Sequence, residues 1–178
     1  MRKRIPQTRA HQKKTHIREK RVASVDNRRD IALILQKNKL LQDILGFSAE
    51  NMSGLFQDGL QFLQMHSYDD ALKIFSLLVR MNPYVADFWV AQGLVYQVKE
   101  EYKTALSSFL VAQTMDPARF EGYLNAIECC ISLGDYAQAQ AIIRQGLRFA
   151  KTHPKIEGLR PFLEEIHYMQ ERIINENS

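Results

Sequence analysis

The sequence predicts an all-α fold in which similar helix pairs stack into a superhelix. Two segments of the chain superimpose with a constant offset of 34 residues, and a third segment follows less closely. The positions that recur carry glycine, alanine, proline or a large apolar residue: Leu55, Gly59, Phe62, Ala71, Phe75 and Pro83, then Trp89, Gly93, Tyr96, Ala105, Phe109 and Pro117. We therefore expect a chain built from repeats rather than around an active-site cleft.

A period of 34 residues is that of the tetratricopeptide repeat (TPR), a pair of antiparallel helices. Gly59 and Gly93 have no Cβ, so the second helix of each repeat can approach the first closely. One repeat cannot bury its own apolar face, and the stack therefore needs its neighbours and a capping helix at each end. The expected repeats span residues 52–85, 86–119 and 120–153.

The chain outside the repeats divides into a tail and two flanking helices. Residues 1–27 are polar and charged, and we expect a basic disordered tail there. Residues 1–29 have a net charge of +9, which leaves −5 for the rest of the chain. A helix at 28–46 and a C-terminal helix at 159–175 complete a TPR domain expected at 28–176. The last helix carries one apolar face, formed by Phe162, Ile166, Met169 and Ile173.

Three roles are open for the basic tail. It can solubilise the chain and steer cargo, dock an acidic partner, or contact nucleic acid in a salt-dependent way. Residues 1–29 contain no aromatic side chain on which bases could stack, which disfavours nucleic acid.

The sequence offers no catalytic or metal-binding motif. Its five histidines lack metal-ligand spacing, and no glycine-rich phosphate loop is present. Cys129 and Cys130 are adjacent on a predicted helix, where their side chains diverge, so we expect no disulfide. No apolar run is long enough to span a bilayer, and the basic start lacks the apolar core of a secretory signal. We expect a cytoplasmic protein that is not an enzyme and uses neither cofactor nor metal.

The first helices of successive TPR repeats line an inner surface, and positions that the repeat core does not use point into it. In this chain those positions are mainly apolar. The predicted cargo-peptide groove consists of Phe56, Leu60, Leu63, Val90, Leu94, Gln97, Leu124, Glu128 and Ile131. Such a groove favours an extended peptide with spaced apolar anchors. The alternative is that the chain's own N-terminal helix covers several of these residues.

The predicted N-terminal helix has more apolar residues than one packing face needs. A second apolar surface on a free monomer favours self-association. The predicted dimerisation residues are Ile31, Leu33, Ile34, Leu40 and Ile44.

Three features point to a known family. Three repeats follow a short helical leader; the first repeat contains Leu55-Phe56 with Tyr68-Asp69-Asp70-Ala71; and the third contains Asn125-Ala126-Ile127-Glu128-Cys129-Cys130. With these features, residues 28–160 resemble the class II chaperones of bacterial type III secretion, the LcrH/SycD-like family.

The resemblance implies a chaperone in the bacterial cytoplasm that holds an extended segment of a secreted protein in its concave groove and keeps that protein soluble and export-competent. The implied cargo is a hydrophobic translocator or a gatekeeper-type regulator. The resemblance also implies dimerisation through the N-terminal helix when no cargo is bound. The alternative function is a scaffold that joins two folded proteins, with the basic tail docking an acidic partner.

Overall fold

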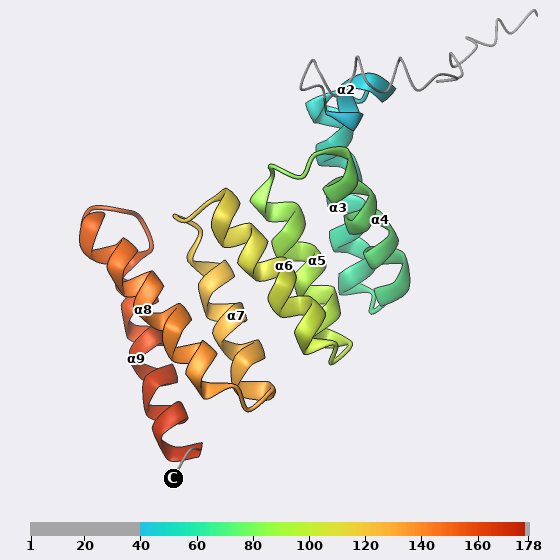
Figure 1. Cartoon of the computed structure of the whole chain (residues 1–178). Coiled ribbons are helices and arrows are strands. Elements are labelled where there is room, and N and C mark those ends of the chain that lie inside the picture. The colour runs from blue at the N-terminus through green and yellow to red at the C-terminus, as the bar shows by residue number, and fades with distance from the viewer. Residues whose placement is uncertain (1–39, 177–178) are drawn as a thin grey trace, which may run out of the picture. The chain divides into compact units, whose positions relative to one another are not determined.

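The computed structural model describes residues 40–176, and all regular structure in that range is α-helical, which confirms the predicted fold class. The helices are labelled in Figure 1. They are α2 (Leu41–Leu45), α3 (Ala49–Gln64), α4 (Tyr68–Met81), α5 (Ala86–Val98), α6 (Tyr102–Met115), α7 (Phe120–Ser132), α8 (Tyr136–Thr152) and α9 (Leu159–Glu176).

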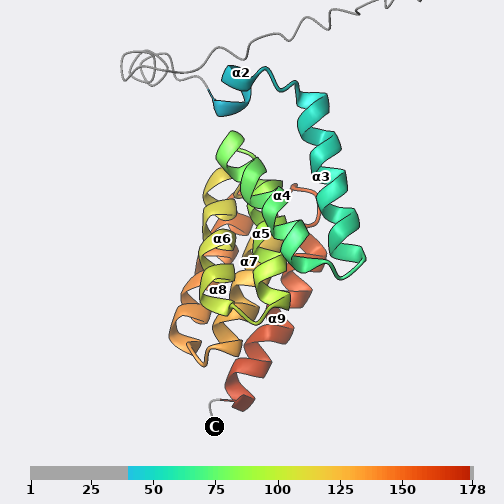
Figure 2. The same cartoon turned by 90° about the vertical axis from the view of Figure 1, so that its right-hand side faces the viewer.

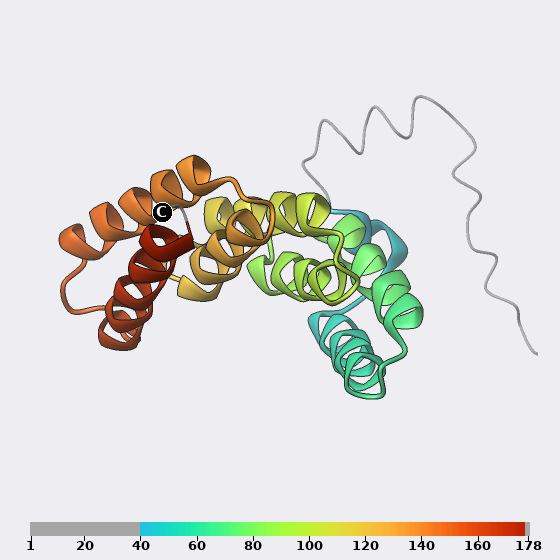
Figure 3. The same ribbon diagram turned by 90° about the horizontal axis from the view of Figure 1, so that it is seen from below.

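The helices of residues 40–176 pack in two rows. Each of α3, α5 and α7 forms a pair with the helix that follows it, and the second helix of a pair also packs on the first helix of the next. Seen from below in Figure 3, α3, α5, α7 and α9 form one row, and α4, α6 and α8 form the other. We call the first of these the inner row. The capping helix α9 therefore continues the inner row beside α7.

The turns inside the three pairs repeat the 34-residue period. His66, Glu100 and Gly134 each adopt a left-handed conformation, with φ of 60°, 60° and 70°. These residues are spaced by 34, and each lies two residues beyond the last residue of the first helix of its pair. The third repeat, whose sequence match is weakest, thus has the same turn as the first two.

The close approach of the paired helices depends on glycine. A Cβ placed on Gly59 would lie 2.6 Å from Cε1 of Phe75, and one on Gly93 would lie 2.6 Å from Cε1 of Phe109. Both phenylalanines are fully buried, and each contributes about 1.5–3 kcal/mol by its removal from water. The aromatic ring of the second helix thus occupies the space that the glycine leaves.

The buried residues form two clusters. One joins α3, α4 and α5, and the other runs from α6 to α9. In α9 the predicted apolar face is confirmed, because its four residues are all nearly inaccessible: Phe162, Ile166, Met169 and Ile173.

The N-terminal helix differs from the prediction. Leu40 is extended, with φ −69° and ψ 153°, so a continuous helix over 28–46 is wrong at this residue. The carboxylate of Asp43 accepts a hydrogen bond from the backbone N–H of Leu40 at 3.3 Å, which favours a helix start here. Gly46, at φ 72°, ends α2 after five residues. The basic tail and three of the predicted dimerisation residues lie outside the described residues: Ile31, Leu33 and Ile34.

α2 and the C-terminal end of α9 lie at opposite ends of the described unit, as Figures 1 and 2 show. α2 contacts α4, and Asn82 after α4 donates a hydrogen bond from Nδ2 to Oε1 of Gln42 at 3.2 Å. No residue of α2 is buried. The cover at this end of the stack is therefore much thinner than the cover that α9 provides.

Candidate functional site

The predicted groove residues all lie on the inner row, in α3, α5 and α7. Most of them are half-buried, so part of each side chain is accessible: Phe56, Leu60, Leu63, Val90, Leu94, Gln97, Leu124 and Glu128. Ile131 differs because it is only 6% exposed and belongs to the core cluster around α7. We leave Ile131 out of the candidate contact surface for this reason.

Phe56 stands at the α2 end of the inner row. Its ring centroid lies 5.7 Å from that of Phe75 and 5.5 Å from that of Phe88, both in tilted arrangements. Phe56 also lines a cavity of about 260 Å³ together with Gln42 of α2 and Asp87 of α5. One side of the ring is therefore anchored in the core, and the other borders a small open pocket.

Gln97 leaves an unused hydrogen-bond acceptor on the inner row. Its side-chain Oε1 is buried and has no hydrogen-bond partner within residues 40–176. Such an unmet acceptor costs about 1–3 kcal/mol.

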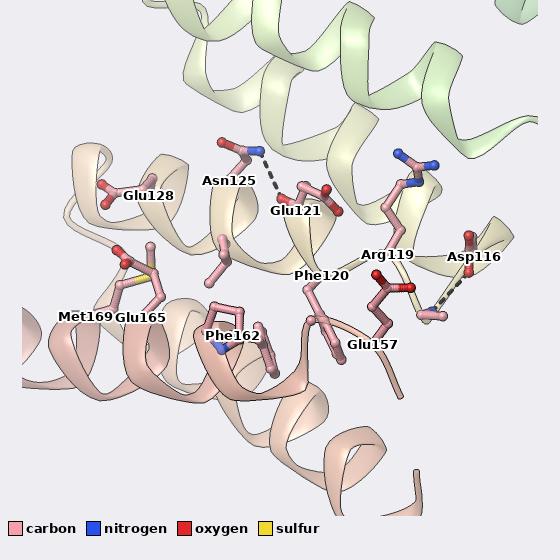
Figure 4. A pocket seen from close by; sticks show the side chains of 14 residues that line it. Asp116, Arg119, Phe120, Glu121, Asn125, Glu128, Glu157, Phe162, Glu165 and Met169 are labelled. Atoms are coloured by element: carbon pink, nitrogen blue, oxygen red, sulfur yellow. Dashed lines mark hydrogen bonds between the residues drawn. The ribbon is translucent and has the colours of Figure 1, made fainter. Parts of the chain in front are cut away.

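A larger cavity of about 760 Å³ lies between α7 and α9, and we call it the α7–α9 pocket. Figure 4 shows side chains of both helices around it. The rings of Phe120 and Phe162 stack at a centroid distance of 4.2 Å and an angle of 11°, and both residues are buried. Leu124 and Met169 add further apolar lining. The floor of the pocket is thus apolar and held by contacts between α7 and α9.

The rim of the α7–α9 pocket is acidic. Glu121, Glu157 and Glu165 line it, are exposed, and form no ion pair within the described part of the chain. The two nearby arginines are already paired. Nη1 of Arg119 lies 2.6 Å from Oδ1 of Asp87, and Nη1 of Arg172 lies 2.7 Å from Oε1 of Glu128. The rim therefore carries uncompensated negative charge.

The two cysteines are buried within α7, away from solvent. Burial raises the pKa of Cys129 to about 12 and that of Cys130 to about 11. Both thiols therefore stay protonated near neutral pH and are poor nucleophiles.

Among residues 40–176, no three His, Cys, Asp or Glu side chains come together as a candidate metal site. In the same range, no helix combines the length and apolar character needed to cross a membrane.

The part of the site that α9 contributes was missed by reasoning from the sequence. From the sequence, Phe162 and Met169 are assigned only to the apolar face of the last helix, and Glu165 is given no role. A signal was present, because Glu165 follows Phe162 by three residues and precedes Met169 by four, which places all three on one side of a helix. What the sequence did not indicate is that α9 would lie beside α7.

The sequence is similar to known proteins over part of its length. No protein-family model matches the chain. The chain is 26% identical over 94 residues to the low calcium response locus protein H of Yersinia pestis. These residues are 53% of this chain and 56% of the relative. The match therefore spans only about half the length of the curated relative.

Solved structures match more of the chain. The complex of PcrH with the chaperone-binding region of PopD matches with a TM-score of 0.65 and 26% identity, over 75% of this chain and 98% of PcrH. A type III secretion complex from Aeromonas hydrophila gives 0.72 with 22% identity, over 83% and 96% of the two chains. The Yersinia enterocolitica chaperone SycD with a YopD peptide gives 0.64 with 21% identity, over 74% and 98%.

The likenesses at 21% and 22% identity establish the fold, and the match to PcrH adds similarity in sequence along nearly its whole length. The resemblance predicted from the sequence is thus confirmed: the chain is a homologue of the low calcium response locus protein H and has the TPR-like fold of the type III secretion chaperones SycD and PcrH.

Proposed function

We propose that this chain is a chaperone of a type III secretion system that acts in the bacterial cytoplasm and holds an extended segment of a secreted protein on its inner row. The observation that carries the proposal is the run of half-buried apolar side chains along α3, α5 and α7. Phe56, Leu60, Leu94 and Leu124 are each partly accessible while the fold around them is packed. Spaced apolar positions of this kind suit apolar anchors of a bound peptide.

The structural relatives support the class of partner. SycD has been solved with a peptide of the translocator YopD, and PcrH with the chaperone-binding regions of PopD and PopB. A translocator is accordingly the favoured cargo here, and a gatekeeper-type secreted regulator is the second. SycD has also been described as a dimer, which agrees with a homodimer of this chain when no cargo is bound. No catalytic activity forms part of the proposal.

Co-expression tests the proposal directly. The full chain is expressed together with each secreted protein encoded near it, and the soluble fraction of each partner is measured with and without the chain. We expect one of these partners to become soluble and to co-purify, and Leu94→Ala to reduce the recovered amount. Partners that stay insoluble in every pairing would contradict the chaperone function. A partner that is folded and soluble alone, yet still binds, would favour the scaffold alternative.

A further inference from the structure

We propose that the α7–α9 pocket binds a lysine or arginine side chain of the secreted protein, beside the apolar anchors held on the inner row. This inference rests on the proposed function and adds to it a charge requirement on the cargo. The site is the cavity with its aromatic floor, and the acidic rim decides which side chain enters.

The floor of the pocket suits the stem of a long basic side chain. Phe120 and Phe162 form a stacked, buried pair, and Leu124 and Met169 extend the apolar surface. Lysine and arginine bury their methylene stems against apolar surface and keep the charged head at its edge. A cavity of about 760 Å³ is large enough for such a side chain together with a neighbouring residue.

The rim suits the cationic head of that side chain. The carboxylates of Glu121, Glu157 and Glu165 border the cavity without an ion-pair partner, whereas Arg119 and Arg172 are held by Asp87 and Glu128. Arg119, the basic side chain in the cavity lining, is therefore already engaged by Asp87. A cationic group brought by a ligand gains from all three carboxylates, and an acidic segment would be repelled.

The pocket is continuous with the predicted groove, which identifies the source of the basic side chain. Leu124 and Glu128 belong both to the groove and to the pocket lining. A peptide that follows the inner row from α3 to α7 thus reaches the pocket with its next residues. The chain's own residues 1–29 are also basic, but they contain no leucine or aromatic residue and offer only the scattered β-branched side chains of Ile5, Ile17, Val22 and Val25 as apolar anchors. The cargo, rather than the tail, is the occupant that fits both parts.

Two matched probe peptides test the charge requirement on the full-length chain. One is fluorescein-labelled Gly-Leu-Ser-Leu-Lys-Leu-Lys-Ser-Gly, and the other has glutamine in place of both lysines. Their binding is measured by fluorescence polarisation at low salt. We expect the lysine probe to bind about five-fold more tightly or better, and the difference to shrink as salt is raised. Equal binding of the two probes would overturn the inference.

A triple variant locates the effect. Glu121→Gln, Glu157→Gln and Glu165→Gln together should make the two probes bind equally. The matched control removes three exposed carboxylates elsewhere, by Asp58→Asn, Glu100→Gln and Glu101→Gln, and should retain the preference for lysine. A preference that survives the pocket variant, or that the control also loses, would assign the effect to general charge and overturn the inference.

Carbodiimide cross-linking, which joins an amine directly to a carboxylate, identifies the occupant. Mass spectrometry should find the probe lysines linked to Glu121, Glu157 or Glu165. Links from these glutamates to tail lysines in the presence of excess probe would instead make the tail the occupant.

Failure of the groove itself gives a different result from failure of the pocket. If the glutamine probe binds and Leu94→Ala weakens it while lysine brings no gain, only the pocket inference fails; if the glutamine probe does not bind at all, the proposed groove fails.

Discussion

Arg172 of the capping helix α9 donates a hydrogen bond to Glu128 of α7, with 2.7 Å between Nη1 and Oε1. Glu128 was predicted from the sequence to face cargo, yet its carboxylate is held by the cap. The pair therefore ties the end of the groove to the helix that completes the stack.

The first prediction concerns the energy of this pair. The two side chains are 31% and 30% exposed, so we expect a coupling of about 0.2–1 kcal/mol, as for other solvent-accessible ion pairs. Glu128→Gln, Arg172→Gln and the double variant form a cycle that denaturant unfolding measures at low and high salt. The exposed i,i+4 pair of Arg160 and Glu164 provides a control cycle within one helix. A coupling unaffected by salt would contradict an electrostatic origin.

Truncation of groove residues should weaken cargo binding. Leu94→Ala together with Phe56→Ala should cost about 2–4 kcal/mol of binding free energy, as truncation of buried anchors does. Phe56→Ala should also lower stability, because its ring contacts Phe75 and Phe88, whereas Leu94→Ala alone should do so less. Calorimetric titration with the identified cargo segment measures the first effect, and thermal unfolding the second. Leu133→Ala, outside the groove, serves as the control; unchanged affinity in the groove variants would refute the assignment.

Two glycines within helices should respond in opposite ways to a methyl group. Gly93→Ala places a Cβ 2.6 Å from the ring of Phe109 and should destabilise the fold by about 1–3 kcal/mol, and Gly93→Leu by at least as much. Gly54→Ala meets nothing within 4 Å and should stabilise α3 by up to about 1 kcal/mol through helix propensity. Thermal or denaturant unfolding measures the change in stability of each variant. An equal effect of both substitutions would mean that the helix pair is not as close as described.

The cysteines should make stability fall at alkaline pH. Burial raises the pKa of Cys129 and Cys130 from 9.0 to about 12 and about 11. Between these values and 9.0 the unfolded chain releases protons that the native chain keeps, so rising pH favours unfolding. We expect the free energy of unfolding to decrease from about pH 9 upward.

The matched variant for this pH effect carries Cys129→Ala and Cys130→Ala, and should lose part of the decrease. In the native wild-type chain, a disulfide reagent at neutral pH should react only as fast as the fold opens. Rapid labelling of both thiols under native conditions would show that α7 is accessible.

Self-association should depend on the short helix α2. Leu41 and Leu45 are 41% and 50% exposed, whereas the predicted contact residues Leu40 and Ile44 are half-buried. We expect the cargo-free chain to sediment as a dimer at tens of micromolar, and Leu41→Glu with Leu45→Glu to give a monomer of unchanged helicity. Leu163→Glu, an exposed leucine of α9, should leave the dimer intact. A wild-type monomer under these conditions would rule out the dimer.

The repeat core could be predicted from the sequence because its requirements are local. The close contact of Gly59 with Phe75 and of Gly93 with Phe109 follows from one glycine and one aromatic residue at fixed spacing. The third repeat also fits. Pro154 lies three residues beyond the position that the spacing of Pro83 and Pro117 predicts, and α8 has 17 residues where α4 and α6 have 14.

Other features depend on how separate segments meet, and no periodicity reveals that. The ion pair of Glu128 with Arg172 and the cavity between α7 and α9 require the position of the cap. The start of α2 after Leu40 was missed because an apolar pattern does not show where a helix starts, whereas the Asp43 carboxylate does so through a single hydrogen bond. Burial of Ile131 has the same origin, since it lies in the cluster that α9 completes.

The helices of the inner row differ strongly in how firmly they are held. α3 has only Met52 and Gly59 buried, whereas α7 has eight buried residues, so the first repeat has much less packing to lose when it opens. In a stack where each repeat is stabilised by its neighbours, such an end frays first. Amide hydrogens of α3 should accordingly exchange with solvent sooner than those of α7. A cargo segment lying across both would slow exchange most in α3, so that cargo binding would also stabilise the chain's own first repeat.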